Sequence, residues 1–264
     1  FIQCNKCAYV CPHASIRPFV LDEAELKAAP FGEAETIPAI GKQFTGMRFM
    51  QAVDVLDCLG CGNCVDVCPG KKGVKALAMK PLETQLDVQK EWDYCIKEVA
   101  SKQDLVDITA NVKNSQFATP LFEFSGACSG CGETPYVKLI SQLFGDHEMV
   151  ANATGCSSIW GGPAATSPYC TNKEGHGPAW CNSLFEDNAE HGLGLYIGQK
   201  TVRENLIKEI AEVAGSDKAS AELKAAFEKF LETKNNTKAN DEPAKALILS
   251  LIHISEPTRL RRIS

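Results

Sequence analysis

The sequence has no apolar run that approaches the roughly 18 to 20 residues a helix needs to cross a bilayer. Its first residues do not form the basic and then apolar stretch of a secretory signal. It also contains no G-x-G-x-x-G or Walker pattern, so no phosphate-binding loop is predicted from its glycines. We therefore expect a cytoplasmic protein with no membrane partner.

An excess of positive charge is also absent. The chain has 264 residues, and its 27 Lys and Arg face 33 Asp and Glu, which gives a formal net charge of −6. This balance argues against nucleic acid as a partner. With 44% hydrophobic residues the chain can fill one or two globular domains.

Cysteine, in contrast, is abundant. The chain has 13 cysteines, many of them in C-x-x-C groups, and without an export signal such groups favour metal ligation over disulfides. One complete C-x2-C-x2-C-x3-C-P run, typical of bacterial ferredoxins, is formed by Cys58, Cys61, Cys64, Cys68 and Pro69. In such runs the fourth cysteine binds the other of two clusters.

A second run begins the chain but has Phe1 where its first cysteine is expected. It supplies Cys4, Cys7 and Cys11. The exchange rule then predicts one four-iron cluster on Cys11, Cys58, Cys61 and Cys64. The other site receives Cys4, Cys7 and Cys68 with Phe1 at the fourth corner, so its iron would be labile there. Zinc is the alternative for paired C-x-x-C groups, but zinc sites use two separated pairs rather than a quartet ending in Cys-Pro.

A third group consists of Cys128, Cys131 and Cys156. From the spacing alone, a zinc knuckle or a redox-active pair explains Cys128 and Cys131 as well as an iron–sulfur site does. Thr134 is expected to cap a helix that presents Val137, Ile140, Leu143 and Phe144 on one face. The segment that follows, residues 149–156, reads as a short strand and a turn of an α/β unit.

Hydrophobic periodicity predicts the remaining elements. A polar helix is expected in residues 21–32, a strand in 48–57 and a closing strand in 74–82. Residues 83–113 and 201–233 read as helices, and 234–243 as a polar loop. Cys95 is interpreted as an ordinary thiol. Cys170 and Cys181 are left uncommitted, either as free thiols or as spare ligands, and His176 and His191 are given no role.

Five segments together resemble pyruvate:ferredoxin (flavodoxin) oxidoreductases of the long single-chain kind. The segments are "CNKCAYVCPHASIRP", "LDCLGCGNCVDVCP", "QFATPLFEFSGACSGCGETPY", "NATGCSSIWGGP" and "GPAWCNSLFEDNAEHGLG". They occur in the order and with the spacing of the family, over nearly all of residues 1–249. The family's fold and activity are therefore expected here.

The resemblance implies an α+β ferredoxin-like domain followed by a truncated α/β domain that binds thiamine diphosphate. We expect the first in residues 1–80, with an insertion at about 13–57, then a linker in 81–120. The partial thiamine diphosphate domain is expected in 121–249. Residues 250–264 do not resemble the family and are expected to be a non-native tail.

The resemblance also implies ligands and cofactors. Cys128, Cys131 and Cys156 match three ligands of a third, proximal 4Fe-4S cluster, whose fourth ligand lies far downstream in the family. Glu133 and Cys156 match positions that line the thiamine site. No catalytic residue is assigned within this chain, because the glutamate that activates thiamine lies upstream in the family and the Mg²⁺ ligands lie downstream.

The activity implied is oxidative decarboxylation of pyruvate, or of a related 2-oxo acid, with coenzyme A as co-substrate. Electrons would leave singly through three 4Fe-4S clusters to ferredoxin or flavodoxin, in a homodimer. We expect Phe1 to replace the family's cysteine at the edge of a truncated sequence, and this chain alone to be inactive. The alternatives are a stand-alone eight-iron carrier of another reductase, which needs no "CSGCGETPY", and a structural zinc protein.

Overall fold

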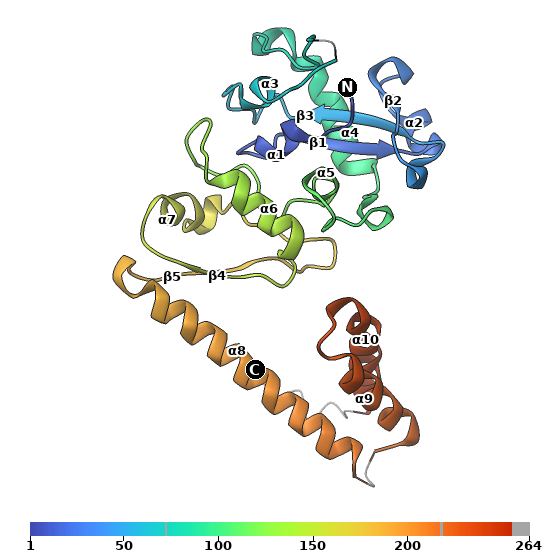
Figure 1. Cartoon of the computed structure of the whole chain (residues 1–264), viewed down its shortest axis with the longest axis vertical. Coiled ribbons are helices and arrows are strands. Elements are labelled where there is room, and N and C mark those ends of the chain that lie inside the picture. The colour runs from blue at the N-terminus through green and yellow to red at the C-terminus, as the bar shows by residue number, and fades with distance from the viewer. Residues whose placement is uncertain (72, 217–218, 255–264) are drawn as a thin grey trace. The chain divides into compact units, whose positions relative to one another are not determined.

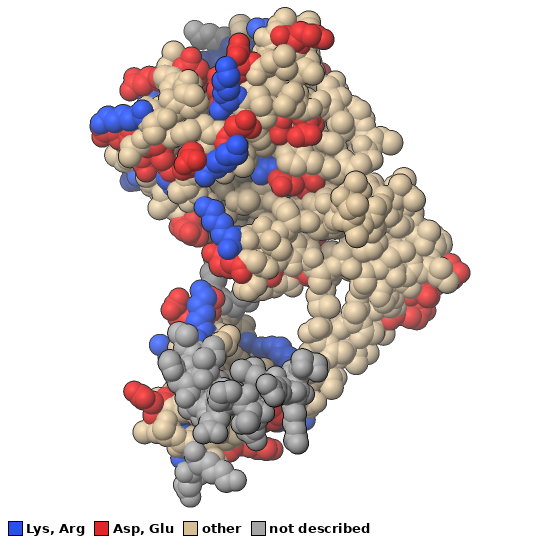
Figure 2. Space-filling view, turned by 180° about the vertical axis from the view of Figure 1, so that it is seen from behind, with Lys and Arg blue, Asp and Glu red and all other residues tan. Residues whose placement is uncertain are grey.

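The computed structural model describes residues 1–71, 73–216 and 219–254, and in residues 237–238 and 249–254 it describes the backbone only. The chain divides into two compact units, residues 1–189 and 190–264 (Figure 1). In Figure 2 basic and acidic side chains lie interspersed over the charged part of the visible surface, beside a large uncharged area.

The first unit is of mixed α and β structure. Its helices are α1 (Lys6–Val10), α2 (Glu23–Ala28), α3 (Asn63–Asp66), α4 (Gln89–Glu98), α5 (Val112–Ser115), α6 (Thr134–Phe144) and α7 (Cys156–Gly161). Its strands are β1 (Ile16–Leu21), β2 (Ile37–Pro38), β3 (Arg48–Val53), β4 (Met149–Asn152) and β5 (Ala179–Asn182). A helix in 21–32 and a strand in 48–57 were expected, and α2 and β3 confirm both.

The strands of the main sheet lie between the two cysteine runs in the sequence. Its order is β1-β3-β2 and both pairs are antiparallel, with Ile16 opposite Val53 and Leu21 opposite Arg48. Since successive side chains of a strand point to opposite faces, Val20 and Leu21 enter different clusters of buried side chains. Both faces of this sheet are therefore covered.

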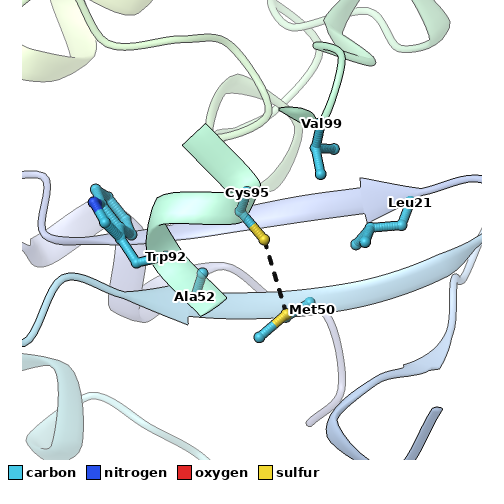
Figure 3. Packing of buried hydrophobic residues seen from close by; sticks show 6 residues of the cluster. All are labelled: Leu21, Met50, Ala52, Trp92, Cys95 and Val99. Carbon is cyan, nitrogen blue, oxygen red and sulfur yellow. Dashed lines mark hydrogen bonds between the residues drawn. The ribbon is translucent and has the colours of Figure 1, made fainter. Parts of the chain in front are cut away.

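Helix α4 covers one face and forms the core there (Figures 1 and 3). The members of this core are Leu21, Met50, Ala52, Trp92, Cys95 and Val99. The Sγ atom of Cys95 lies 4.0 Å from Sδ of Met50. Cys95 is therefore a packed core thiol, as its place in a helical segment suggested. On the opposite face Phe44 and Phe117 pack against each other with ring centroids 5.3 Å apart and ring planes tilted by 55°.

A smaller parallel sheet follows, in which β4 pairs with β5 and Met149 lies opposite Ala179. Parallel strands require a crossover connection, and α7 lies in the one between β4 and β5. The expected helix and strand of this region are confirmed by α6 and β4. The expected cap is wrong, because the residue at the N-cap position is Glu133 and Thr134 is the first, fully buried residue of the helix.

Two further expectations are wrong. Residues 74–82 form no strand, only an isolated bridge between Lys71 and Val74, because apolar side chains such as Val74 and Met79 are exposed and have no buried face. Residues 234–243 are not a polar loop throughout, since α10 (Thr237–Ile254) begins within them and includes Pro243.

The second unit is helical, with α9 (Ala221–Thr233), α10 and most of α8 (Asn188–Ala214). Its core contains Ile210, Leu223, Phe227 and Leu247. The spacing that predicted these helices is confirmed for α9, whereas in α8 Val202 and Leu206 are exposed. In the described part of the chain, no helix is long and apolar enough to cross a membrane. Of the proposed tail, residues 255–264 lie outside the described residues.

Candidate metal centres

The larger cysteine-lined cavity has a volume of about 480 Å³. Four of the residues that line it are Cys11, Cys58, Cys61 and Cys64. Cys11 is the residue that ends α1, and the other three precede or begin α3. These are the four cysteines that the exchange between two runs assigns to one cluster.

Glycine gives the 58–64 loop its shape. Gly60 and Gly62 have φ values of 65° and 80°, and a Cβ at either position would meet no atom within 4 Å. Glycine is thus favoured here by the left-handed backbone and not by crowding. The turns at these positions allow cysteines three residues apart to line one cavity.

The smaller cavity, of about 230 Å³, is lined by Cys4, Cys7, Cys68 and Phe1. The Phe1 side chain is half exposed at the position of the missing thiol. Gly70 closes the cavity with φ 60°, and a Cβ there would lie 2.0 Å from the carbonyl oxygen of Val74. The structure therefore brings together the three cysteines assigned to the second site, together with the phenylalanine.

Burial favours the protonated form of three of these thiols in the absence of metal. It raises the pKa of Cys7 to about 12 and that of Cys64 to about 11, and it raises the pKa of Cys58 as well. For Cys68, burial acts in the same direction but backbone N–H groups outweigh it, among them that of Ala76 at 3.3 Å, so the pKa is lowered. Because iron binds thiolates, metal binding must release protons.

The donor set and the spacing fit a cluster better than a single ion. A zinc ion would hold four sulfurs at about 2.3 Å each. Thiols spread around a cavity suit a four-iron cluster, in which each cysteine binds a different iron.

The Cys128–Cys131 loop packs directly on the loop of the larger cavity. Oγ of Ser129 donates a hydrogen bond to the carbonyl of Leu59 at 3.0 Å. At Gly130, where φ is 75°, a Cβ would lie 3.5 Å from Cβ of Cys61. The loop that contains Cys128 and Cys131 is thus adjacent to the larger cavity.

The remaining predicted residues lie apart from these cavities. Cys156 is exposed at the first position of α7, and Glu133 is exposed at the N-cap of α6. Neither cysteine-lined cavity includes Cys128, Cys131 or Cys156. Cys170 and Cys181 lie near backbone carbonyls, those of Pro120 and Val150.

Two side chains that the sequence reasoning missed connect these segments. Nζ of Lys138 donates to the carbonyls of Ala8, Tyr9 (3.2 Å) and Cys11 (3.0 Å). Burial lowers the pKa of Lys138 to about 8. The ring of His13 lies with Nδ1 3.2 Å from the carbonyl of Asp57 and Nε2 against that of Ser125. No local pattern in the sequence marked either residue.

Known proteins are similar to this chain both in the region of the two cysteine runs and over most of its length. Residues 2–72 match the family described as a 4Fe-4S dicluster domain. The chain is 51% identical over 241 residues to the pyruvate:ferredoxin oxidoreductase of Moorella thermoacetica, which is 91% of this chain and 20% of that relative. It is 47% identical over 245 residues to a pyruvate-flavodoxin oxidoreductase of Klebsiella pneumoniae, which is 93% of this chain and 20% of the relative.

The chain is homologous to one segment of the pyruvate:ferredoxin (flavodoxin) oxidoreductases. It spans about a fifth of the length of these relatives. A pyruvate dehydrogenase [NADP(+)] of Cryptosporidium parvum is 53% identical over 205 residues, 76% of this chain and 10% of the relative. Homology to these oxidoreductases extends far beyond the dicluster domain, so a stand-alone ferredoxin is not the better description.

Proposed function

We propose that this chain is the electron-transfer segment of a pyruvate:ferredoxin (flavodoxin) oxidoreductase. The two cysteine-lined cavities would each hold an iron–sulfur cluster, and Cys128, Cys131 and Cys156 would supply three ligands of a third. The clusters would accept electrons singly during oxidative decarboxylation of pyruvate or a related 2-oxo acid. The product acyl group would pass to coenzyme A.

The contact between two cysteine loops carries this proposal. The Ser129 hydroxyl donates a hydrogen bond to the carbonyl of Leu59, and Gly130 faces Cys61, so the loop with Cys128 and Cys131 is adjacent to the larger cavity. Cys7 lies in α1 and Cys11 directly follows it, and these two cysteines line different cavities. These contacts support a path in which electrons would pass stepwise between neighbouring clusters.

The thiamine site belongs to the same proposal. Bound thiamine diphosphate would supply the carbanion chemistry of decarboxylation. Glu133 and Cys156 are the residues proposed to line it, while Mg²⁺ ligands are proposed elsewhere in the longer protein. Neither residue lines either of the two cysteine-lined cavities, so these two residues alone do not form a site that fits the cofactor.

The partners proposed follow from the relatives' names and from the charge. Ferredoxin or flavodoxin would take the electrons, in the cytoplasm, and the whole protein would be a homodimer. This chain by itself would not turn over pyruvate, because it corresponds to about a fifth of the relatives' length.

The proposal is tested by loading the full chain anaerobically with ferrous iron and sulfide. We expect about seven to eight iron atoms per chain from the two cavities, with matching acid-labile sulfide. Cys61→Ser is expected to lower the iron content by about half, and Cys170→Ala, outside both cavities, to leave it unchanged. Colourless protein that binds zinc in place of iron would contradict the proposal.

The third site needs its own variant. Cys128→Ser should leave the iron of the two cavities in place and alter only an additional electron paramagnetic resonance signal. The same substitution is also made at the matching cysteine of a full-length homologous enzyme. If that variant and its wild type give identical spectra, the third cysteine group does not bind a cluster. The stand-alone carrier would then be the better description of residues 1–80.

A further inference from the structure

Lys138 is a buried cation on α6 in an unusual setting. Its side chain is among the fully buried ones, with 2% of the residue exposed. The surrounding face of α6 is polar and includes Thr134, Ser141 and Gln142, all buried. A lysine is almost never fully buried unless its charge is compensated, so the groups around it need an explanation.

The ammonium group has all of its hydrogens bonded. It donates to three carbonyl oxygens at the end of α1, those of Ala8, Tyr9 and Cys11. Three donated bonds are the pattern of an ammonium, because a neutral amine has only two hydrogens. The last carbonyls of a helix lack partners within the helix and carry partial negative charge, so a cation is favoured there.

These bonds do not neutralise the charge. In the described part of the chain, no ion pair joins Lys138 to a carboxylate, and the nearby Arg17 is itself paired with Glu123. An unpaired buried charge is strongly unfavourable. The neighbouring groups that become anionic when they bind metal are the thiols of Cys11 and Cys7, and as thiolates they would attract the ammonium. A cluster bound by thiolates would provide the missing counter-charge.

Building on the proposed function, we propose that Lys138 is a positioning residue for the cluster bound by Cys11, Cys58, Cys61 and Cys64. Its ammonium holds the end of α1, and through it Cys11, against α6. It also places a fixed positive charge beside that cluster. Because reduction adds one electron to the cluster, with no bond broken and no proton moved, this charge raises the reduction potential.

The test is an anaerobic redox titration of the iron-loaded full chain with dithionite, followed by electron paramagnetic resonance. In Lys138→Met, which has similar length and no charge, we expect iron and sulfide to be retained. The reduction equilibrium of the Cys11 cluster should move at least tenfold toward the oxidised form, about 59 mV for one electron. Lys138→Arg, which keeps the charge, should shift less.

Lys97→Met is the matched control, because it removes one exposed lysine from the same unit. Its potentials should equal those of the unsubstituted chain. Equal potentials in Lys138→Met and wild type would overturn the inference, since a purely structural lysine would leave the potential unchanged.

Loss of iron has a defined meaning in this comparison. If Lys138→Met binds less iron while Lys138→Arg binds the normal amount at nearly normal potential, the positive charge positions the ligand and the inference stands. If both variants lose iron, the positive charge of residue 138 is not what holds the cluster, and the inference fails. Absence of iron–sulfur signals from the unsubstituted chain would contradict the proposed function itself.

Discussion

Phe1 shows how far one side chain changes a metal site. The smaller cavity contains three cysteines and this aromatic ring, whereas the larger contains four cysteines. A phenylalanine has no atom that binds iron, so one iron of a cluster in the smaller cavity would have no protein ligand. The two sites are therefore expected to differ in how firmly they keep iron.

We predict that Phe1→Cys raises the iron content by about one atom per chain, because it completes a four-thiolate set. The measurement is iron per chain after a chelator has removed loosely held metal. Leu105→Cys, which adds an exposed thiol far along the sequence from both runs, is the control and should change nothing. Equal iron in wild type and Phe1→Cys would show that the fourth ligand comes from elsewhere.

Cys95 represents the other use of cysteine in this chain. Burial raises the pKa of its thiol from about 9 to about 12, so the folded state keeps it protonated where the unfolded state ionises it. Its stabilising contribution is therefore fully present below pH 9 and is lost as the pH rises toward 12.

We predict that Cys95→Ala lowers the free energy of unfolding by about 1 kcal/mol at pH 7, through lost packing against Met50. The difference from wild type should shrink between pH 9 and 10.5. Urea denaturation monitored by tryptophan fluorescence measures the loss of stability and its pH dependence, since Trp92 lies in the same core. A difference that stays constant over this range would mean that the Cys95 thiol titrates alike in both states.

At the scale of elements, Arg17 of β1 ties the sheet to the segment before the third cysteine group. It pairs with Glu123 in a largely buried contact, and its guanidinium lies 5.1 Å from the ring centre of Trp92 and 5.8 Å from that of Phe124. The planar guanidinium can stack and form an ion pair at once, which an ammonium cannot do equally well.

We predict that Arg17→Met destabilises the chain by about 2 to 3 kcal/mol and Arg17→Lys by about half as much. Removing Arg17 leaves Glu123 partly buried without its partner. The control is Lys27→Met, whose pair with Glu23 is largely exposed, and its effect should be within about 0.5 kcal/mol. Equal effects of Arg17→Met and Lys27→Met in urea denaturation would refute this role.

Local patterns predicted some of these elements and missed others for a physical reason. The cysteine spacing grouped the cysteines into the same two sets that line the two cavities, and periodicity predicted α6, β3 and β4. Lys138 was not predicted, because its acceptors lie about 130 residues earlier in the chain. For 74–82 an alternating pattern was present, but no neighbouring strand pairs with it. Contacts between distant segments decide such cases.

The exposed side of α6 also contradicts a local expectation. Its apolar residues Tyr136, Ile140 and Phe144 are exposed, while its polar side is buried toward α1 and α5. Hydrophobic periodicity locates a helix but does not say which side faces the protein when buried hydrogen bonds hold the other side.

At the scale of the whole chain, the chemistry is confined to one of the two units. All of the cysteines lie between residues 4 and 181, within the unit that ends at residue 189. The second unit has a core of its own, built from Ile210, Leu223, Phe227 and Leu247. Metal binding should therefore not depend on the second unit.

We predict that a chain ending at Ala189 binds as much iron and sulfide as the full chain, because every proposed ligand and Lys138 remain. A chain ending at Pro120 keeps both cysteine runs but loses α6, and with it the bonds from Lys138 to the end of α1. We expect it to bind less iron in the larger cavity. Iron analysis and the electron paramagnetic resonance of all three chains, loaded side by side, measure this.

If the chain ending at Ala189 lost iron, the second unit would contribute to the sites. If the chain ending at Pro120 kept full iron with unchanged spectra, the two runs alone would be sufficient, and α6 would have no part in holding Cys11.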